Sequence, residues 1–327
     1  MDDLKTAQRA LAVDFKNPPH DLAQSLAGKT ILVTGGASGF GCSIIKEFLK
    51  QPDTAAIIAD LNDSNGSEFE RSLREAGHKA KYVQVDVTDW NSVISLFRSA
   101  LIWLRDTFGP DRDIDHVVCS AGLPSQGLDT TPVDPDEFLN EEYATSPPSS
   151  KSINVSVVGS LHTVSAAMKF AMGLHKPDDK RDRSITLFAS LAGYTGISHR
   201  SDYTASKWGV RGLFRSLLDD KESATCPVRV NLVAPTFVET PLTAHAVPTL
   251  RKIGIKFAAI EDVRDAALRL VSDRSIHGRA AGVWQGGPVD LCDDQAGGFG
   301  EATIADRIES GVMKMPTTQA AKKREMA

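Results

Sequence analysis

The sequence has few of the features that mark membrane, metal-binding or nucleic-acid-binding proteins. No apolar run reaches the roughly eighteen residues that a membrane-spanning helix needs. The net charge is −5, so no basic excess favours nucleic acid or an anionic membrane as a partner. The eight histidines show no metal-ligand spacing, and the zinc motif H-E-x-x-H is absent. We therefore expect a globular protein with no membrane span, no nucleic-acid partner and no bound metal.

Cysteine is also scarce. The four cysteines are far apart and form no C-x-x-C pair: Cys42, Cys119, Cys226 and Cys292. Cys42 and Cys119 lie in apolar stretches, which favours buried thiols in a reducing compartment. The first twenty residues are polar and acidic, unlike a secretory signal. These observations predict a cytoplasmic location.

What the sequence does contain is a regular alternation of strand-like and helix-like segments over most of its 327 residues. Strands are expected at 31–33, 55–60, 81–87, 114–119, 184–189, 228–233 and 281–284. Helices are expected at 44–49, 67–75, 90–108, 154–172, 203–220 and 261–272. This alternation predicts an α/β fold in a single domain. Its core would be a doubly wound, Rossmann-type parallel sheet of about seven strands with helices on both faces.

The ends of the chain and one internal segment lack this alternation. Residues 1–27 are expected to form an N-terminal extension and 293–327 a C-terminal tail, which leaves 28–292 as the domain. Residues 123–150 are rich in proline, serine, threonine and aspartate, so they are predicted to be largely loop.

The stretch Lys29–Gly41, KTILVTGGASGFG, joins the first strand to the first helix through glycines. A glycine-rich strand-to-helix turn lets the backbone approach a diphosphate, whose charge is favoured at the helix N-terminus. The spacing is T-G-x-x-x-G-x-G rather than G-x-G-x-x-G, and a glycine-rich turn alone can be a plain loop. Support comes from Asp60, which closes the second strand. An acidic residue there can bind an adenosine ribose 2′-hydroxyl and repel a 2′-phosphate, although it could also be a turn residue.

Tyr203 and Lys207 are four residues apart at a helix start, so they project from one face. A phenol titrates near 10, and a neighbouring ammonium lowers that pKa and makes the phenol a usable general acid or base. The alternative is an ordinary amphipathic pair. Ser190 ends a buried strand, where its hydroxyl can orient a substrate carbonyl; alternatively, Ser190 is an ordinary turn residue at the strand end. Asn154 opens a helix, where it can join a polar relay or cap the helix.

Taken together, these motifs resemble the short-chain dehydrogenase/reductase family over residues 28 to 290. The resemblance is carried by TGGASGFG (34–41), the Ala-Gly that ends strand four, Asn154, Ser190, YTASK (203–207) and NLVAPTFVETPL (231–242). It implies that Tyr203 is the catalytic acid/base, that Lys207 lowers the Tyr203 pKa and binds the nicotinamide ribose, and that Ser190 polarises the carbonyl. Asn154 would hold a water in the proton relay.

The resemblance also implies the residues that contact the dinucleotide. Besides Tyr203 and Lys207, they are Gly35, Ser38, Gly39, Phe40, Gly41, Asp60, Leu61, Asp86, Val87, Ala121, Gly122, Pro235, Val238 and Thr240. The positions where NADP-using relatives place a cation are Ser38, Leu61 and Asn62 here, so NAD is the expected cofactor. The chain departs from the family at Cys119-Ser120, where an asparagine is usual, and at Pro235-Thr236, where Pro-Gly is usual.

These observations predict an NAD(H)-dependent oxidoreductase that interconverts a secondary alcohol and a ketone. The segments 123–150, 191–202 and 236–260, the last acting as a lid, would bound the substrate. They carry the apolar residues Gly193, Tyr194, Ile197, Phe237, Leu242, Val247 and Leu250. A hydrophobic substrate such as a lipid, terpenoid, steroid or other secondary metabolite is therefore expected. One alternative is an NAD(H)-binding scaffold or sensor without turnover, and another is an NADP(H)-using reductase that also steers a cyclisation. The resemblance further implies a homodimer or homotetramer, paired through helices 154–172 and 203–220.

Overall fold

The computed structural model describes residues 12–15, 22–129, 131–139, 146–172, 181–218 and 228–293. The compact unit Val13–Leu291 contains every helix and strand discussed below. Most of the predicted tail 293–327, and Cys226, lie outside the described residues. Within the predicted extension 1–27, Leu26 is fully buried and Val13, Phe15 and Leu22 pack against the core. The last part of that extension therefore belongs to the core.

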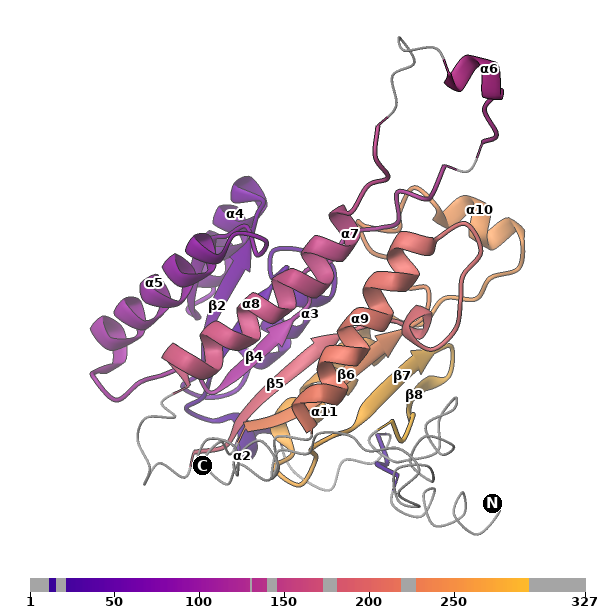
Figure 1. Cartoon of the computed structure of the whole chain (residues 1–327). Helices are drawn as coiled ribbons and strands as arrows, with labels where there is room; N and C mark the ends of the chain where they lie inside the picture. The colour runs from indigo at the N-terminus through magenta and orange to yellow at the C-terminus, as the bar shows by residue number, and fades with distance from the viewer. Residues whose placement is uncertain are drawn as a thin grey trace, which may run out of the picture. The chain divides into compact units, whose positions relative to one another are not determined.

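The sheet has eight strands in the order β3-β2-β1-β4-β5-β6-β7-β8 (Figure 1). The strands are β1 Thr30–Thr34, β2 Ala55–Asp60, β3 Lys79–Gln84, β4 His116–Cys119, β5 Arg183–Phe188, β6 Val228–Pro235, β7 Ala280–Trp284 and β8 Gly287–Asp290. All neighbouring pairs are parallel except β7 with β8. The predicted doubly wound parallel sheet is thus confirmed. The prediction lacked β8, a four-residue strand joined to β7 by a two-residue turn at Gln285-Gly286.

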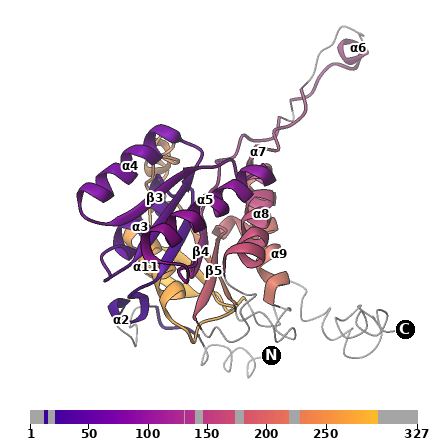
Figure 2. The same ribbon diagram turned by 90° about the vertical axis from the view of Figure 1, so that its left-hand side faces the viewer.

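Helices cover both faces of the sheet, and apolar strand residues are buried on each face. On β2, Ile57 packs into the cluster beneath α5 Trp90–Phe108, α8 Gly159–Ala166 and α9 Ser201–Leu218. Ile58, on the opposite face, packs with α3 Gly39–Phe48, α4 Asp63–Glu75 and α11 Ile260–Ser272. Each fully buried isoleucine stabilises the fold by about 1.5–3 kcal/mol relative to exposure. Figure 2 shows these two helical layers from the side.

Two predicted helices differ in detail from the structure. Helix α4 begins at Asp63 rather than 67, because the Asn62 side chain caps it by accepting a hydrogen bond from Asn65 N at 3.0 Å. Glycine is required in its first turn, since a Cβ on Gly66 would lie 2.1 Å from the Tyr82 ring. The helix predicted at 154–172 is split. It runs through α7 Lys151–Ile153, the π-helix η1 Asn154–Val158, α8, and the π-helix η2 Ala167–Ala171.

The remaining described helices are short, and all but the first follow the carboxyl end of a β-strand. They are α2 Leu22–Leu26, which precedes β1, and α6 Pro135–Phe138, η3 Leu191–Gly193 and α10 Val247–Lys252. From β1 the chain proceeds to β2 and β3 on one side, whereas β4 starts the other half of the sheet on the opposite side of β1. The connections after β1 and β4 therefore diverge, which opens a crevice at the carboxyl ends of these two strands.

Candidate active site

The glycine turn after β1 is shaped by close backbone contacts. Gly35 has φ +66°, and a Cβ there would lie 2.9 Å from Ala121 Cα at the end of β4. A Cβ on Gly41 would lie 2.3 Å from the Gly35 carbonyl oxygen. Side chains at these positions would push the turn away from β4. The turn leads into α3, where the N-cap side chain of Ser38 makes no capping hydrogen bond, so the first N–H groups of the helix remain available to an anion.

Asp60 closes β2 and is tied to this turn. Its Oδ2 accepts a hydrogen bond from Ala37 N at 3.0 Å, and its Oδ1 accepts one from Asn62 N at 3.0 Å. The Tyr82 hydroxyl donates to the Asp60 carbonyl at 3.2 Å. Burial and the nearby carboxylates of Asp63 and Asp60 raise the pKa of Tyr82 to about 12, so it remains a neutral donor. Asp60 is therefore a fixed carboxylate at the edge of the crevice.

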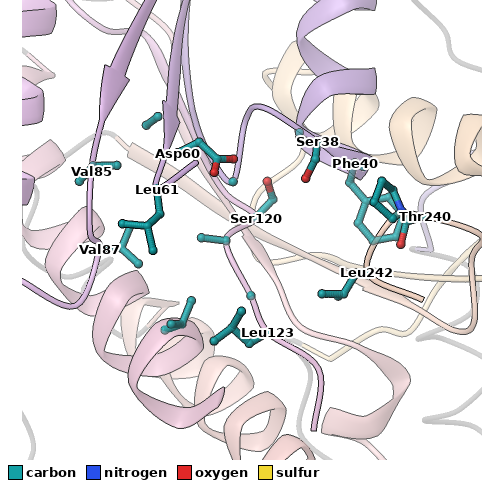
Figure 3. A pocket seen from close by; sticks show the side chains of 18 of the residues that line it. Ser38, Phe40, Asp60, Leu61, Val85, Val87, Ser120, Leu123, Thr240 and Leu242 are labelled. Atoms are coloured by element: carbon teal, nitrogen blue, oxygen red, sulfur yellow. The ribbon is translucent and has the colours of Figure 1, made fainter. Parts of the chain in front are cut away.

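A groove of about 320 Å³ runs along this crevice (Figure 3). The predicted cofactor residues that line it are Gly35, Ser38, Gly39, Phe40, Gly41, Asp60, Leu61, Asp86, Val87, Ala121, Gly122 and Thr240. The groove is also lined by residues that were not predicted to contact the cofactor: Ala59, Val85, Ser120, Leu123, Val155, Pro241 and Leu242, the last of which was predicted to contact the substrate. Most of these neighbour a predicted residue in the chain, which is the signal that could have found them. Neither lysine nor arginine is among the lining residues.

The end of β4 lacks the asparagine that is usual in the family, and Ser120 provides a connection there. Its hydroxyl donates to the Thr34 carbonyl at 2.6 Å, and its backbone N–H donates to the same oxygen at 3.2 Å. The carboxyl ends of β1 and β4 are thus joined beneath the groove. The preceding residue, Cys119, is buried, and burial raises the pKa of its thiol to about 12. This agrees with the buried thiol predicted for Cys119, whereas Cys42, also predicted to be buried, is only half-buried.

Tyr203 and Ser190 meet at the carboxyl end of β5. The Ser190 hydroxyl donates to the Pro235 carbonyl at 3.1 Å and accepts from Ala192 N at 3.1 Å, which fixes its position. Burial raises the pKa of the Tyr203 phenol, and a hydrogen bond between its side chain and that of Ser190 acts in the opposite direction. The phenol is therefore held in its protonated form at neutral pH.

Lys207 lies one turn along α9 from Tyr203. Its ammonium Nζ is 5.5 Å from the centre of the Tyr203 ring and donates to the Phe188 carbonyl at 3.1 Å. Burial lowers the pKa of Lys207 to about 8. The predicted pair is thus brought together. However, Lys207 is not among the groups that act on the Tyr203 pKa here, and that pKa is raised rather than lowered.

Asn154 is not brought to this cluster. Its side chain is exposed, and its Nδ2 donates to Ser150 Oγ at 3.3 Å. Two residues further along the π-helix η1, the Ser156 hydroxyl is buried and has no hydrogen-bond partner among the described residues. A Cβ on Gly122 would lie 3.7 Å from Ser156 Oγ and 3.5 Å from Lys207 Nζ. Both polar atoms therefore flank the space beside Gly122, which also lines the groove.

Sequence reasoning missed Ser156. The available signal was the four-residue spacing of Ser152, Ser156 and Ser160, which places three hydroxyls on one face of an otherwise apolar helix. All three are buried in the structure. Asn154 falls on a different face because its position in the helix is two residues away from this row.

The segment predicted as a lid is anchored at both ends. Val238 forms a parallel bridge with Ala258, and Ala258 N donates to the Phe237 carbonyl at 2.9 Å. Thr240 approaches the glycine turn, since a Cβ on Gly39 would lie 3.7 Å from it. Pro235 contributes its carbonyl to Ser190 rather than a surface of the groove. Of these predicted residues, Thr240 therefore lies nearest the expected cofactor path.

Within the described part of the chain, no group of three or more histidine, cysteine, aspartate or glutamate side chains is arranged to hold a metal. The helices of that part include none that is both long and apolar enough to cross a bilayer.

The sheet order, the glycine turn and the groove at the carboxyl ends of β1 and β4 define a dinucleotide-binding α/β protein. A family model described as short chain dehydrogenase matches residues 29–251. The chain therefore belongs to the short-chain dehydrogenase family and is an oxidoreductase of that family.

Two relatives and one solved structure are similar to this chain. It is 34% identical to 5'-hydroxyaverantin dehydrogenase of Dothistroma septosporum, over 85% of this chain and 91% of the relative. It is 28% identical to NADP-dependent dehydrogenase M3 of a Phoma species, over 90% of this chain and 88% of the relative. The fold resembles that of 3-ketoacyl-(acyl-carrier-protein) reductase from Brucella melitensis, solved with NADH. The TM-score is 0.63 at 23% identity, covering 79% of this chain and 97% of that one.

Proposed function

We propose that the protein interconverts a secondary alcohol and a ketone, using NAD(H). The observation that carries this proposal is the position of Tyr203 beside the dinucleotide groove. Its side chain is hydrogen-bonded to that of Ser190, and Lys207 lies one helical turn away. Gly122 connects the two parts of the site, because it lines the groove and the space beside its Cα faces Lys207 Nζ. An acid/base and a cofactor site thus adjoin.

The residues would divide the chemistry as follows. When bound, the nicotinamide supplies the hydride acceptor for alcohol oxidation or the hydride donor for ketone reduction. Ser190 would orient the substrate oxygen by turning its single O–H away from the Pro235 carbonyl, while Ala192 N continues to hold its oxygen in place. Tyr203 accepts the hydroxyl proton in oxidation and donates it in reduction. Lys207 holds a positive charge beside the phenol and binds the ribose.

We infer that Ser156, rather than Asn154, completes the proton path. The Lys207 ammonium has three N–H donors, and one is used by the Phe188 carbonyl. The unpartnered Ser156 hydroxyl flanks the same space beside Gly122. A water there would meet polar partners on two sides, which is the condition for a stable buried water. Such a water would carry a proton to and from Lys207.

The preference for NAD rests on charge. The fixed Asp60 carboxylate stands at the end of β2, and the groove has no lysine or arginine to balance a 2′-phosphate. The relative from Phoma is named as NADP-dependent. NADP(H) is therefore the competing assignment, and the charge of Asp60 distinguishes the two.

We infer a hydrophobic substrate from the apolar side chains that are exposed in the segments predicted to bound it. Ile197 is 36% exposed, Phe237 is 36% exposed and Leu242 is 42% exposed. Burying such side chains against a ligand stabilises a complex by about 25 cal/mol per Å² of apolar surface. The relative 5'-hydroxyaverantin dehydrogenase supports a substrate of this class, because its name indicates oxidation of a hydroxylated metabolite. Gly193 and Tyr194 do not contribute to this exposed apolar surface, because they pack on Lys207 and Arg211 of α9.

A homodimer or homotetramer remains the expected assembly. Large apolar side chains stay exposed on the outer helices, with Leu161 51% exposed on α8 and Trp208 41% exposed on α9. These are the helices for which the family resemblance implies pairing between subunits. A cytoplasmic location likewise remains a prediction of the sequence.

The test is turnover of a panel of apolar and aromatic secondary alcohols with NAD, followed by NADH absorbance. Tyr203→Phe removes the proton-transferring hydroxyl, and general acid/base catalysis is worth about 10²–10⁴-fold in rate. We expect at least that loss in kcat, with NADH binding retained. NADH binding by the wild-type protein without turnover of any alcohol would instead favour a scaffold or sensor.

A further inference from the structure

Asp202, the residue immediately before Tyr203, holds a distant segment of the chain. Its buried carboxylate accepts a hydrogen bond from Gln126 N at 2.8 Å through Oδ2 and one from the Ser125 hydroxyl through Oδ1. Gly127 N donates to Ser125 Oγ at 2.9 Å, which closes a tight turn around the carboxylate. The beginning of the long loop after β4 is therefore tied to the first turn of α9.

A second connection joins the same two regions on the other side of Tyr203. The Ser152 hydroxyl is 3.4 Å from the Leu123 carbonyl and 3.2 Å from Ser206 Oγ. Ser206 Oγ in turn donates to the Tyr203 carbonyl at 2.7 Å. Ser152 and Ser206 are fully buried. Residues 123–127 are thus fixed to the first turn of α9 by two independent sets of hydrogen bonds.

Residues 123–127 also approach residues 191–202, the second of the segments predicted to bound the substrate. Gly127 has φ +81°, and a Cβ there would lie 3.9 Å from the His199 carbonyl oxygen. At the opposite end of the segment, Leu123 lines the dinucleotide groove. Residues 123–127 therefore extend from the dinucleotide groove to His199, and they contact Asp202, the residue before Tyr203, along the way.

The rest of the loop is different. Leu128 is 47% exposed, Phe138 is 63% exposed and Leu139 is 75% exposed. The helix α6 that carries Phe138 projects away from the sheet and its covering helices (Figure 2). The hydrogen bonds to Asp202 and Ser152 described above therefore hold only the start of this loop, within residues 123–127.

We propose that Asp202 is a positioning residue for the substrate, which holds residues 123–127 as a fixed wall beside Tyr203. This inference rests on the proposed function. The wall limits where an apolar alcohol can lie, so that its carbinol oxygen meets Tyr203 and Ser190. A carboxylate suits this task because it only accepts hydrogen bonds and all of its partners here are donors.

The test compares Asp202→Asn with two other variants in the full-length protein. Asparagine keeps the shape but removes the charge and replaces one acceptor by an NH2 group. Its oxygen can still accept from Gln126 N, whereas Ser125 can then bond it only as an acceptor, so both charge-assisted hydrogen bonds are lost and the clamp weakens. Ser125→Ala removes one donor only and is the milder variant. Asp134→Asn is the matched control, because Asp134 also accepts a backbone hydrogen bond in this loop, from Asp136 N at 2.8 Å, but at the exposed start of α6.

Two readouts separate positioning from a general structural effect. In Asp202→Asn, we expect the KM for the alcohol to rise about tenfold, with smaller changes in kcat and in the NADH Kd. Hydrogen exchange of the backbone amides in 123–127 should become faster, while exchange in the β-strands stays unchanged. Ser125→Ala should give smaller effects in the same direction, and Asp134→Asn should match the wild type.

Unchanged exchange in Asp202→Asn, or faster exchange with an unchanged KM, overturns the proposal. An equal loss of NADH affinity also overturns it, because the effect would then be structural. A wild-type protein that turns over no alcohol overturns the proposed function and with it the substrate role of Asp202. That outcome is visible before any variant is made, so the two failures are distinguishable.

Discussion

Neutralising Asp60 is expected to reduce the discrimination between NADH and NADPH. The carboxylate is held at the end of β2 by Ala37 N and Asn62 N, so it cannot turn away from a ribose in the groove. Two unit charges about 5 Å apart interact by about 3 kcal/mol at an effective dielectric constant of 20. That energy corresponds to about a 150-fold difference in affinity.

The expected value is smaller than this limit because Asp60 is partly exposed. Solvent and salt screen exposed charges, with a Debye length of about 8 Å at physiological ionic strength. We therefore expect Asp60→Asn to lower the ratio of NADH to NADPH affinity by about 10- to 100-fold. Most of the change should come from tighter NADPH binding, because asparagine can still hydrogen-bond the ribose of NADH.

The assay is the Kd of each reduced cofactor, measured by fluorescence for wild type and variant at two salt concentrations. The discrimination by the wild type should weaken at high salt, whereas that of the variant should change little. Asp63→Asn provides the control, because it removes the same charge three residues along, at the exposed start of α4. A wild-type preference for NADPH, or an unchanged ratio in Asp60→Asn, would refute the reasoning.

Two further substitutions test the acid/base and its proton path. Ser190→Ala removes the hydrogen bond that lowers the Tyr203 pKa, so that pKa rises. Because oxidation needs the phenolate, the pH profile of kcat/KM should move to higher pH, and a downward shift would contradict this. Ser156→Ala removes a buried, unpartnered hydroxyl. The free energy of unfolding should fall by no more than about 1 kcal/mol, while kcat falls about tenfold; an unchanged kcat would exclude the relay.

Much of this protein follows from local sequence. Apolar runs such as Ile31–Val33 are buried as strands because periodicity and burial are local properties of the chain. Glycine at 41 is dictated by the Gly35 carbonyl within the same turn, which is a local contact. Gly35 has φ +66°, which favours glycine locally, although the backbone that it faces belongs to Ala121, a tertiary contact. The four-residue spacing of Tyr203 and Lys207 sets their common face locally as well. The fold, the groove and the acid/base pair were therefore predictable.

The remainder depended on tertiary contacts that no local pattern encodes. Ser156 rather than Asn154 lies beside Gly122, because packing against the segment after β4 decides which face of the helix after Ser150 turns toward Lys207. The raised pKa of Tyr203 arises from burial, which depends on everything packed around the phenol. Asp202 meets Gln126 across 76 residues of chain, and only the folded sheet brings them together. Sequence thus determined which chemistry is present, and tertiary structure decided which side chains can take part, because burial and long-range contact are properties of the assembled fold.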